Sequence, residues 1–208
     1  NSQSILHLDE SGKGTYRFGV NNHDTIFQRN LGLMAMSLDS ADDPNGQLKE
    51  YLKNATGAWL YRTADVIKND LNPSNNPSDP YNDLSGDWPE GWQYTPSGEG
   101  SLMQFLLGML TKGTNNSALY GTQVNVGDNS FFKNTITAYI HSMSPVAIKQ
   151  PGFEWKGKSY LPAWYGDGDK YFQEHAMKYF GALGLYYYYK NDMEAVQKIR
   201  WVMLHLEP

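Results

Sequence analysis

Residues 170–205 read KYFQEHAMKYFGALGLYYYYKNDMEAVQKIRWVMLH, and this stretch decides the fold class. Apolar residues recur through it at helical spacing, and only a very short turn at Asn191 interrupts them. The sequence therefore predicts two consecutive helices, about Lys170 to Lys190 and about Asp192 to His205, that pack as a hairpin. The run Tyr186 to Tyr189 presents rings to several faces of the first helix, so we expect burial on more than one side.

The same periodicity returns earlier in the chain and predicts a series of further helices. Their expected extents are about His23 to Leu38, Leu48 to Leu71, Ser101 to Leu110, and Phe131 to Met143. In the first of them Phe27, Leu31, Met34 and Leu38 form an apolar stripe, which we interpret as the inward face. The first two helices would form a hairpin, so the chain holds three helix pairs.

The connections between these pairs are long and rich in Asn, Pro, Gly and aromatic residues. They cover about Leu71 to Gly100, Lys112 to Asn129, and Ser144 to Asp169, and no strand alternation of any length occurs in them. An all-α chain of this kind fits an incomplete (α/α) toroid built from helical hairpins, as a single domain over residues 1–208 or a fragment of one. An α-solenoid would have shorter and more uniform loops.

The composition excludes several classes of protein. A formal net charge of -5 argues against a nucleic-acid binder, which would carry a basic patch. No apolar run approaches the roughly 20 residues of a membrane span, so no membrane partner is expected. The chain has no cysteine, which excludes disulfides and thiolate metal sites, while its 15 Tyr and 6 Trp suit either a sugar cleft or a core. Without an initial methionine or a signal pattern, we expect a mature or excised segment.

The segment Asn21-Asn22-His23-Asp24 lies at a predicted helix start and is the first candidate for chemistry. An Asn side chain can hold a carboxylate by hydrogen bonding, and His23, four residues before Phe27, is expected along the inward stripe. The alternative is structural: either Asn caps the helix and His23 is a first-turn surface residue.

Three segments in this order resemble the toroidal alginate lyases and the heparinase II/III-like lyases. They are Asn22-His23 before the helix that contains Leu31 to Leu38, the Trp-Pro-Glu-Gly-Trp-Gln-Tyr stretch at 88–94, and the aromatic-Gly-Asp-Gly turn at 164–168. The resemblance implies β-elimination on a uronic-acid-containing polysaccharide, with no metal and no cofactor. It also implies a secreted or periplasmic enzyme, and a β-sandwich domain after this segment, which would be either separate or missing.

By the same resemblance, Asn22 neutralises the uronate carboxylate and His23 assists it or acts as base. Such donors are needed because the proton alpha to a carboxylate becomes acidic only if the developing enolate charge is met. Tyr94 is the best candidate for the acid and base, although relatives often place that tyrosine one helical turn later, where this chain has Ser97-Gly98. Tyr94 would otherwise stack on sugar or pack under its loop. The expected substrate-binding residues are Arg17, Trp88, Glu90, Trp92 and Trp164.

Two other functions remain open from the residues alone. Glu90 with a neighbouring carboxylate, Asp87 or Glu99, could hydrolyse glycosides on a similar helical toroid. A non-catalytic helical domain could also bind glycans through its aromatic rings. In all three cases the expected partner is a polysaccharide, anionic in the case of the lyase.

Overall fold

The computed structural model describes residues 22–38, 40–60, 86, 91–120, 122–149, 152, 157–163 and 173–206. Their helices, in chain order, are α1 (Asn22–Ser37), η2 (Ser40–Asp42), α2 (Gln47–Leu60), α3 (Thr95–Lys112), α4 (Ser117–Tyr120), η4 (Thr122–Val124), η5 (Val126–Asp128), α5 (Ser130–Ser142), α6 (Gln173–Tyr189) and α7 (Met193–Leu206). Within these ranges the only extended pairings are isolated bridges between Met143 and Pro162 and between Ile148 and Ser159. The described part of the chain is therefore all-α, which confirms the predicted class.

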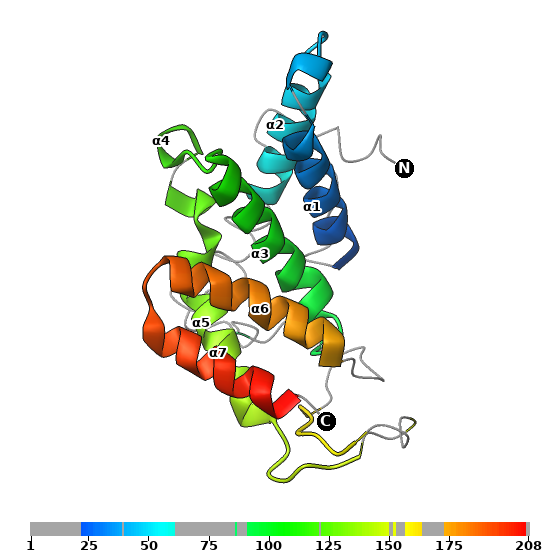
Figure 1. Ribbon diagram of the computed structural model, residues 1–208, viewed down its shortest axis with the longest axis vertical. Coiled ribbons are helices and arrows are strands. Elements are labelled where there is room, and N and C mark those ends of the chain that lie inside the picture. The colour runs from blue at the N-terminus through cyan, green and yellow to red at the C-terminus, as the bar shows by residue number, and fades with distance from the viewer. Residues whose placement is uncertain are drawn as a thin grey trace, which may run out of the picture.

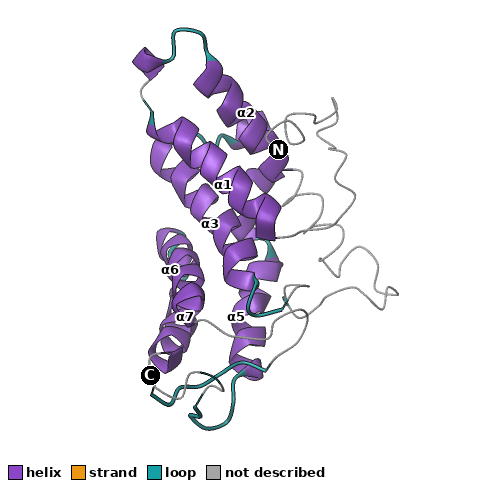
Figure 2. Ribbon diagram, turned by 90° about the vertical axis from the view of Figure 1, so that its right-hand side faces the viewer, coloured by secondary structure: helices purple, strands orange, loops and turns teal. Residues whose placement is uncertain are grey.

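Helix α3 lies at the centre of the molecule. Five of its apolar side chains are 0% exposed: Leu102, Met103, Phe105, Leu106 and Met109. The helix packs against α1 on one side and against α6 on another. Figure 2 shows α6 and α7 as one layer beside a second layer that contains α3 and α5. A helix buried on several sides in this way forms the core around which the others pack.

Helices α1 and α3 run parallel, side by side (Figure 1). Thr25 of α1 bonds Ser97 of α3, and one turn later Arg29 bonds Gln104. Since the contacts follow the same order along both helices, the two first turns lie at the same end. Helix α2 returns beside α1, so the predicted first hairpin is present.

The face of α1 that is turned to α3 is not the predicted apolar stripe. Thr25 and Gly32 are buried, whereas Met34 is 43% and Leu38 is 47% exposed. A Cβ atom on Gly32 would overlap the Phe105 ring, so the two helices approach closely at this glycine. The predicted inward face was wrong at Met34 and Leu38, because Thr25 and Gly32, together with Leu33 and Met36 beside Gly108, form the contact with α3.

Local signals in the sequence account for the helix ends. Asp43 accepts hydrogen bonds from the backbone N–H groups of Gln47 (2.7 Å) and Leu48 (2.8 Å), which otherwise lack partners at the start of α2. Gly113 ends α3 in the left-handed conformation, with φ 72°, and its N–H bonds the carbonyl of Leu110. The side chain of Asn129 caps α5 by accepting from the N–H of Phe131.

Helices α6 and α7 form the predicted hairpin, joined through Asn191, which has a left-handed φ of 58°. The tyrosine run at the end of α6 is buried on one side only. Tyr186 is 0% and Tyr187 is 2% exposed, whereas Tyr188 is 66% and Tyr189 is 69% exposed. Burial on several sides was therefore a wrong expectation for this run.

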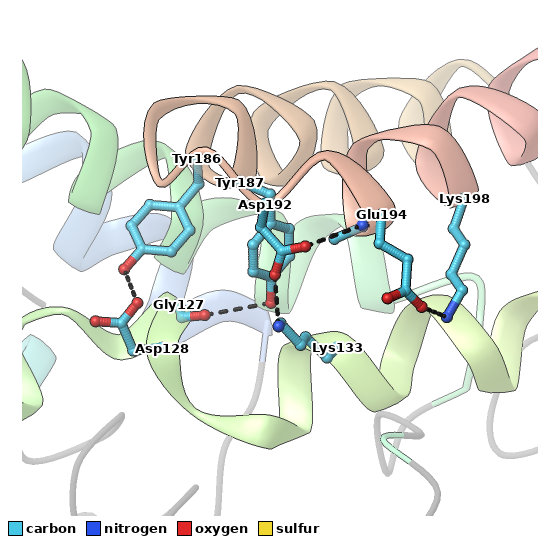
Figure 3. Close-up of polar contacts among 9 residues, drawn as sticks. Gly127, Asp128, Lys133, Tyr186, Tyr187, Asp192, Glu194 and Lys198 are labelled. Carbon is cyan, nitrogen blue, oxygen red and sulfur yellow. Dashed lines mark hydrogen bonds and ion pairs between the residues drawn. The ribbon is translucent and has the colours of Figure 1, made fainter.

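Polar contacts tie this hairpin to η5 and α5 (Figure 3). The Tyr186 hydroxyl donates to Asp128 at 2.8 Å, and the Tyr187 hydroxyl donates to the carbonyl oxygen of Gly127 at 3.2 Å. Figure 3 also shows Asp192 paired with Lys133, at 2.5 Å. The middle of the chain is thus not a simple third hairpin, because α5 packs against α7 and η5 while α3 packs against α1 and α6.

None of the helices in the described ranges is long and apolar enough to cross a membrane.

Candidate functional site

The first turns of α1 and α3 meet at one end of the helix pair, and this meeting point is the candidate site. The Thr25 hydroxyl donates to the carbonyl oxygen of Ser97 at 3.3 Å and fixes the two turns together. Asn22 and His23 are the first two residues of α1, and Tyr94 immediately precedes α3. The fold therefore brings the backbones of the three predicted catalytic residues to the same end of the α1–α3 pair.

Helical geometry separates positions 22 and 23. Successive residues of an α-helix are about 100° apart, so position 22 shares a face with Ile26 and Arg29, four and seven residues later. Position 23 falls instead with Phe27 and Asn30. The expectation that His23 follows the inward face of α1 stays a prediction. The side chains of both residues lie outside the described part.

Tyr94 is partly buried and its backbone opens α3. Its N–H bonds the carbonyl oxygen of Gly91 at 3.0 Å, and its carbonyl oxygen accepts from the N–H of Gly98 at 2.8 Å. The helix begins at Thr95, about six residues before the predicted start. Pro96 and the following glycines suggested a loop, yet proline is well suited to the first turn of a helix.

A small cavity of about 190 Å³ opens between helices α1, α3 and α6. We call it the three-helix pocket, and it is lined by Ile26 and Arg29 of α1, Pro96, Ser97 and Gln104 of α3, and Lys178 of α6. Its two charged residues are cationic, and its other polar residues carry a hydroxyl and an amide. The helix N-termini nearby add further positive potential. The pocket therefore favours an anion.

Arg29 is half-buried and is held by neutral partners. It donates to the Gln104 side-chain oxygen at 2.8 Å and to the Asn30 side-chain oxygen at 3.0 and 3.1 Å. Burial lowers the pKa of Arg29 from its usual value, but a guanidinium stays protonated at neutral pH. Among the ion pairs of the described residues, none involves Arg29 or Lys178. The positive charge in the pocket is thus not neutralised by a described carboxylate.

A buried polar network lies behind the pocket and was not predicted from the sequence. The Glu99 side chain is 0% exposed, and its Oε2 accepts from the Thr135 hydroxyl at 3.2 Å and from the Tyr179 hydroxyl. The carbonyl oxygen of Gly86, at 2.6 Å, shares the single hydroxyl hydrogen of Thr135 with Glu99. Burial, and after it the charge of Glu99, raise the pKa of Tyr179 well above its usual value. The network joins α3, α5 and α6 and holds the pocket's walls in place.

The other predicted residues divide into two groups. Trp92 is 3% exposed, and its ring packs edge-on against Tyr139 at 4.9 Å between centroids, so it belongs to the core. Glu99, one of the neighbouring carboxylates considered for hydrolysis, is enclosed in the network. Arg17, Trp88, Glu90 and Trp164 lie outside the described residues.

The residues that line the pocket were not predicted from the sequence, although the spacing along α1 could have indicated one of them. Arg29 follows Asn22 by seven residues and so shares its face of α1. Ser97, Gln104 and Lys178 carry no such signal, because only the packing of three helices brings them together. In the described ranges, no group of three His, Asp or Glu side chains lies close enough to hold a metal ion.

A scan against models of protein families found no match, and searches of the curated proteins and of the solved structures found none either. The fold and the pocket therefore carry the functional argument by themselves.

Proposed function

We propose that this chain is the helical part of a polysaccharide lyase that cleaves a uronic-acid-containing polymer by β-elimination. The observation that supports the proposal is the three-helix pocket, which is lined by two cationic side chains that have no carboxylate partner among the described residues. An enzyme that removes the proton alpha to a carboxylate needs donors for the developing charge at that place.

The arrangement of the helices supports an incomplete (α/α) toroid. Parallel α1 and α3, with α2 returning beside α1, have the order of inner and outer helices in such an array. In a toroid the first turns of successive inner helices surround one end of the cleft. Residues of α1, α3 and α6, mostly from the N-terminal halves of these helices, line one pocket, which supports this arrangement.

Each residue then has a defined role. Asn22 donates to the uronate carboxylate, and His23, at the same helix end, assists it or accepts the alpha proton. Tyr94 protonates the oxygen of the departing 4-linked sugar, and for one stereochemistry it first removes the alpha proton. Arg17, Trp88, Glu90 and Trp164 bind sugar, while buried Trp92 supports the start of α3 from below. Such a reaction requires a polar cleft and hydrogen-bond donors that are shielded from water.

The test is an absorbance assay near about 235 nm for unsaturated uronate, run on a panel of anionic polysaccharides. We expect product with the wild-type chain, together with its β-rich partner domain if one is required. The variants Asn22→Ala, His23→Ala and Tyr94→Phe should lose at least tenfold in turnover, as expected when one general acid, base or charge-stabilising donor is removed. Their helical circular dichroism and melting temperature should stay close to the wild-type values.

Matched controls exist for each variant. Asn45 lies in the exposed turn before α2, His141 is exposed at the end of α5, and Tyr188 is 66% exposed on α6. Asn45→Ala, His141→Ala and Tyr188→Phe should therefore keep full activity. Full activity in all three site variants would refute the assignment, and cleavage without the new absorbance would indicate a glycoside hydrolase instead. Binding without cleavage would indicate a glycan-binding domain.

A further inference from the structure

The three-helix pocket lies beside the proposed catalytic residues, but those residues do not use its two cationic side chains. Arg29 lies about two helical turns beyond Asn22, on the same face of α1. Lys178 reaches the pocket from α6. The proposed elimination needs one carboxylate neutralised, and Asn22 and His23 are assigned to it. The charge of Arg29 and Lys178 is thus available for a second group.

The chemistry of the pocket specifies an oxyanion on a sugar. The Arg29 guanidinium offers several donors in one plane, and the Lys178 ammonium adds a mobile point charge. Ser97 and Gln104 supply a hydroxyl and an amide at the same wall. Gln104 holds the guanidinium at 2.8 Å through its oxygen, which orients Arg29 without cancelling its charge. A preoriented cation with neutral partners is suited to binding a sulfate or a carboxylate.

The size of the cavity agrees with such a group. A volume of about 190 Å³ can hold a sulfate ester or a carboxylate with a few water molecules, but it is too small for a whole disaccharide. The pocket would therefore accept one substituent, while the sugar that carries it lies outside.

The geometry points to the three-helix pocket as a subsite for a second anionic group, a sulfate ester or a carboxylate, on the sugar next to the one that is cleaved. This inference rests on the proposed lyase function for the placement of the cleaved sugar. It narrows the substrate class to polymers with anionic groups on consecutive sugars.

The experiment is calorimetric binding of two probes to the full chain at low salt. One probe is a polymannuronate tetrasaccharide, which carries carboxylates only, and the other is a heparin tetrasaccharide, which also carries sulfates. We expect Arg29→Gln and Lys178→Gln each to weaken binding roughly tenfold, the effect of losing one charge-assisted contact. Added salt should weaken wild-type binding more than it weakens binding to either variant.

The control is Arg200→Gln. Arg200 is exposed on α7 and borders a separate groove between α6 and α7, so the same change of charge there should leave both affinities unchanged. Circular dichroism of each variant separates lost binding from lost folding, and Lys178, which is exposed, can be replaced without disturbing the core.

The two probes identify the group that is bound. If Arg29→Gln weakens both, the pocket takes the carboxylate of a neighbouring uronate, and if it weakens only the heparin fragment, it takes a sulfate. Wild-type affinity for both probes in both variants would overturn the inference, and so would a wild-type chain that binds neither.

The absorbance assay is independent of these results. Product formation with unchanged binding in the variants would support the lyase and refute the subsite. Weakened binding in the variants, without product formation by the wild-type chain, would support the subsite and refute the lyase.

Discussion

The carboxylate of Glu99 is 0% exposed, and the donors that reach its Oε2 are the hydroxyls of Tyr179 and Thr135. A buried charge or dipole costs free energy unless hydrogen bonds compensate for it. The hydrogen bonds of Glu99 therefore stabilise the fold and also fix the positions of α3 and α6 beside the pocket. This network acts on the site by holding α3 and α6 together rather than by touching the substrate.

We predict that Tyr179→Phe lowers the free energy of unfolding by about 1–3 kcal/mol, because a buried carboxylate loses one of its donors. Urea denaturation followed by circular dichroism measures this change. Tyr188→Phe removes the same hydroxyl from a ring that is 66% exposed and should change stability very little. Equal stability of the two variants would show that the Glu99 network does not support the fold.

At the scale of elements, the contact between α1 and α3 depends on a glycine. A Cβ atom at position 32 would overlap the Phe105 ring, whereas a Cβ atom at Gly181 of α6 would have no neighbour within 4 Å. These two glycines lie inside helices and differ in what surrounds them. They form a matched pair for testing the packing.

Gly32→Ala should destabilise the chain by about 1–3 kcal/mol, because α1 must shift away from α3 to admit the methyl group. Gly181→Ala should stabilise it by up to about 1 kcal/mol, because alanine favours the helix and meets open space. Thermal unfolding of both variants gives the comparison. A stabilising Gly32→Ala would contradict the close approach of α1 and α3 and, with it, the location of the pocket.

Much at this scale could be predicted from the sequence. The starts of α1 and α5 and both helices of the last hairpin follow from apolar periodicity and from capping residues such as Asn129. The start of α3 was missed because Pro96 suits both a loop and a first turn. The inward face of α1 was missed because α1 and α3 approach each other closely at Gly32. A glycine has no side chain, so it does not contribute to a pattern of apolar residues.

The candidate site was less predictable than the helices. Asn22, His23 and Tyr94 were proposed from their order along the chain, and the packing of α1 on α3 brings their backbones to one end of this helix pair. Arg29, Gln104 and Lys178 come from three helices, and their proximity depends on how α1, α3 and α6 pack. No spacing in one sequence specifies that packing.

For the molecule as a whole, the buried tyrosines set a limit on alkaline stability. Burial is the first cause that raises the pKa values of Tyr179, Tyr186 and Tyr187 above the usual value, and nearby carboxylates raise them further. In the unfolded chain these groups ionise near about pH 10. Below that pH both states keep the protons, whereas above it the unfolded chain releases protons that the fold retains, so stability falls as pH rises.

We therefore predict that the helical signal is constant up to about pH 10 and is lost cooperatively above it. The three buried tyrosines, Tyr179, Tyr186 and Tyr187, should ionise together with this transition. A titration that follows tyrosinate absorbance and circular dichroism on the same sample measures both. Complete ionisation of all 15 tyrosines without loss of helix would contradict the burial described for these three.

The central claim is that the ends of α1 and α3 form the site of a β-elimination. The most direct measurement is the mass of the products released from a purified uronate oligosaccharide. We predict two fragments whose masses add up to that of the substrate, one of them with an unsaturated sugar at its non-reducing end, and the loss of both in Asn22→Ala. Fragments that together exceed the substrate by the mass of one water, or unchanged release by Asn22→Ala, would contradict it.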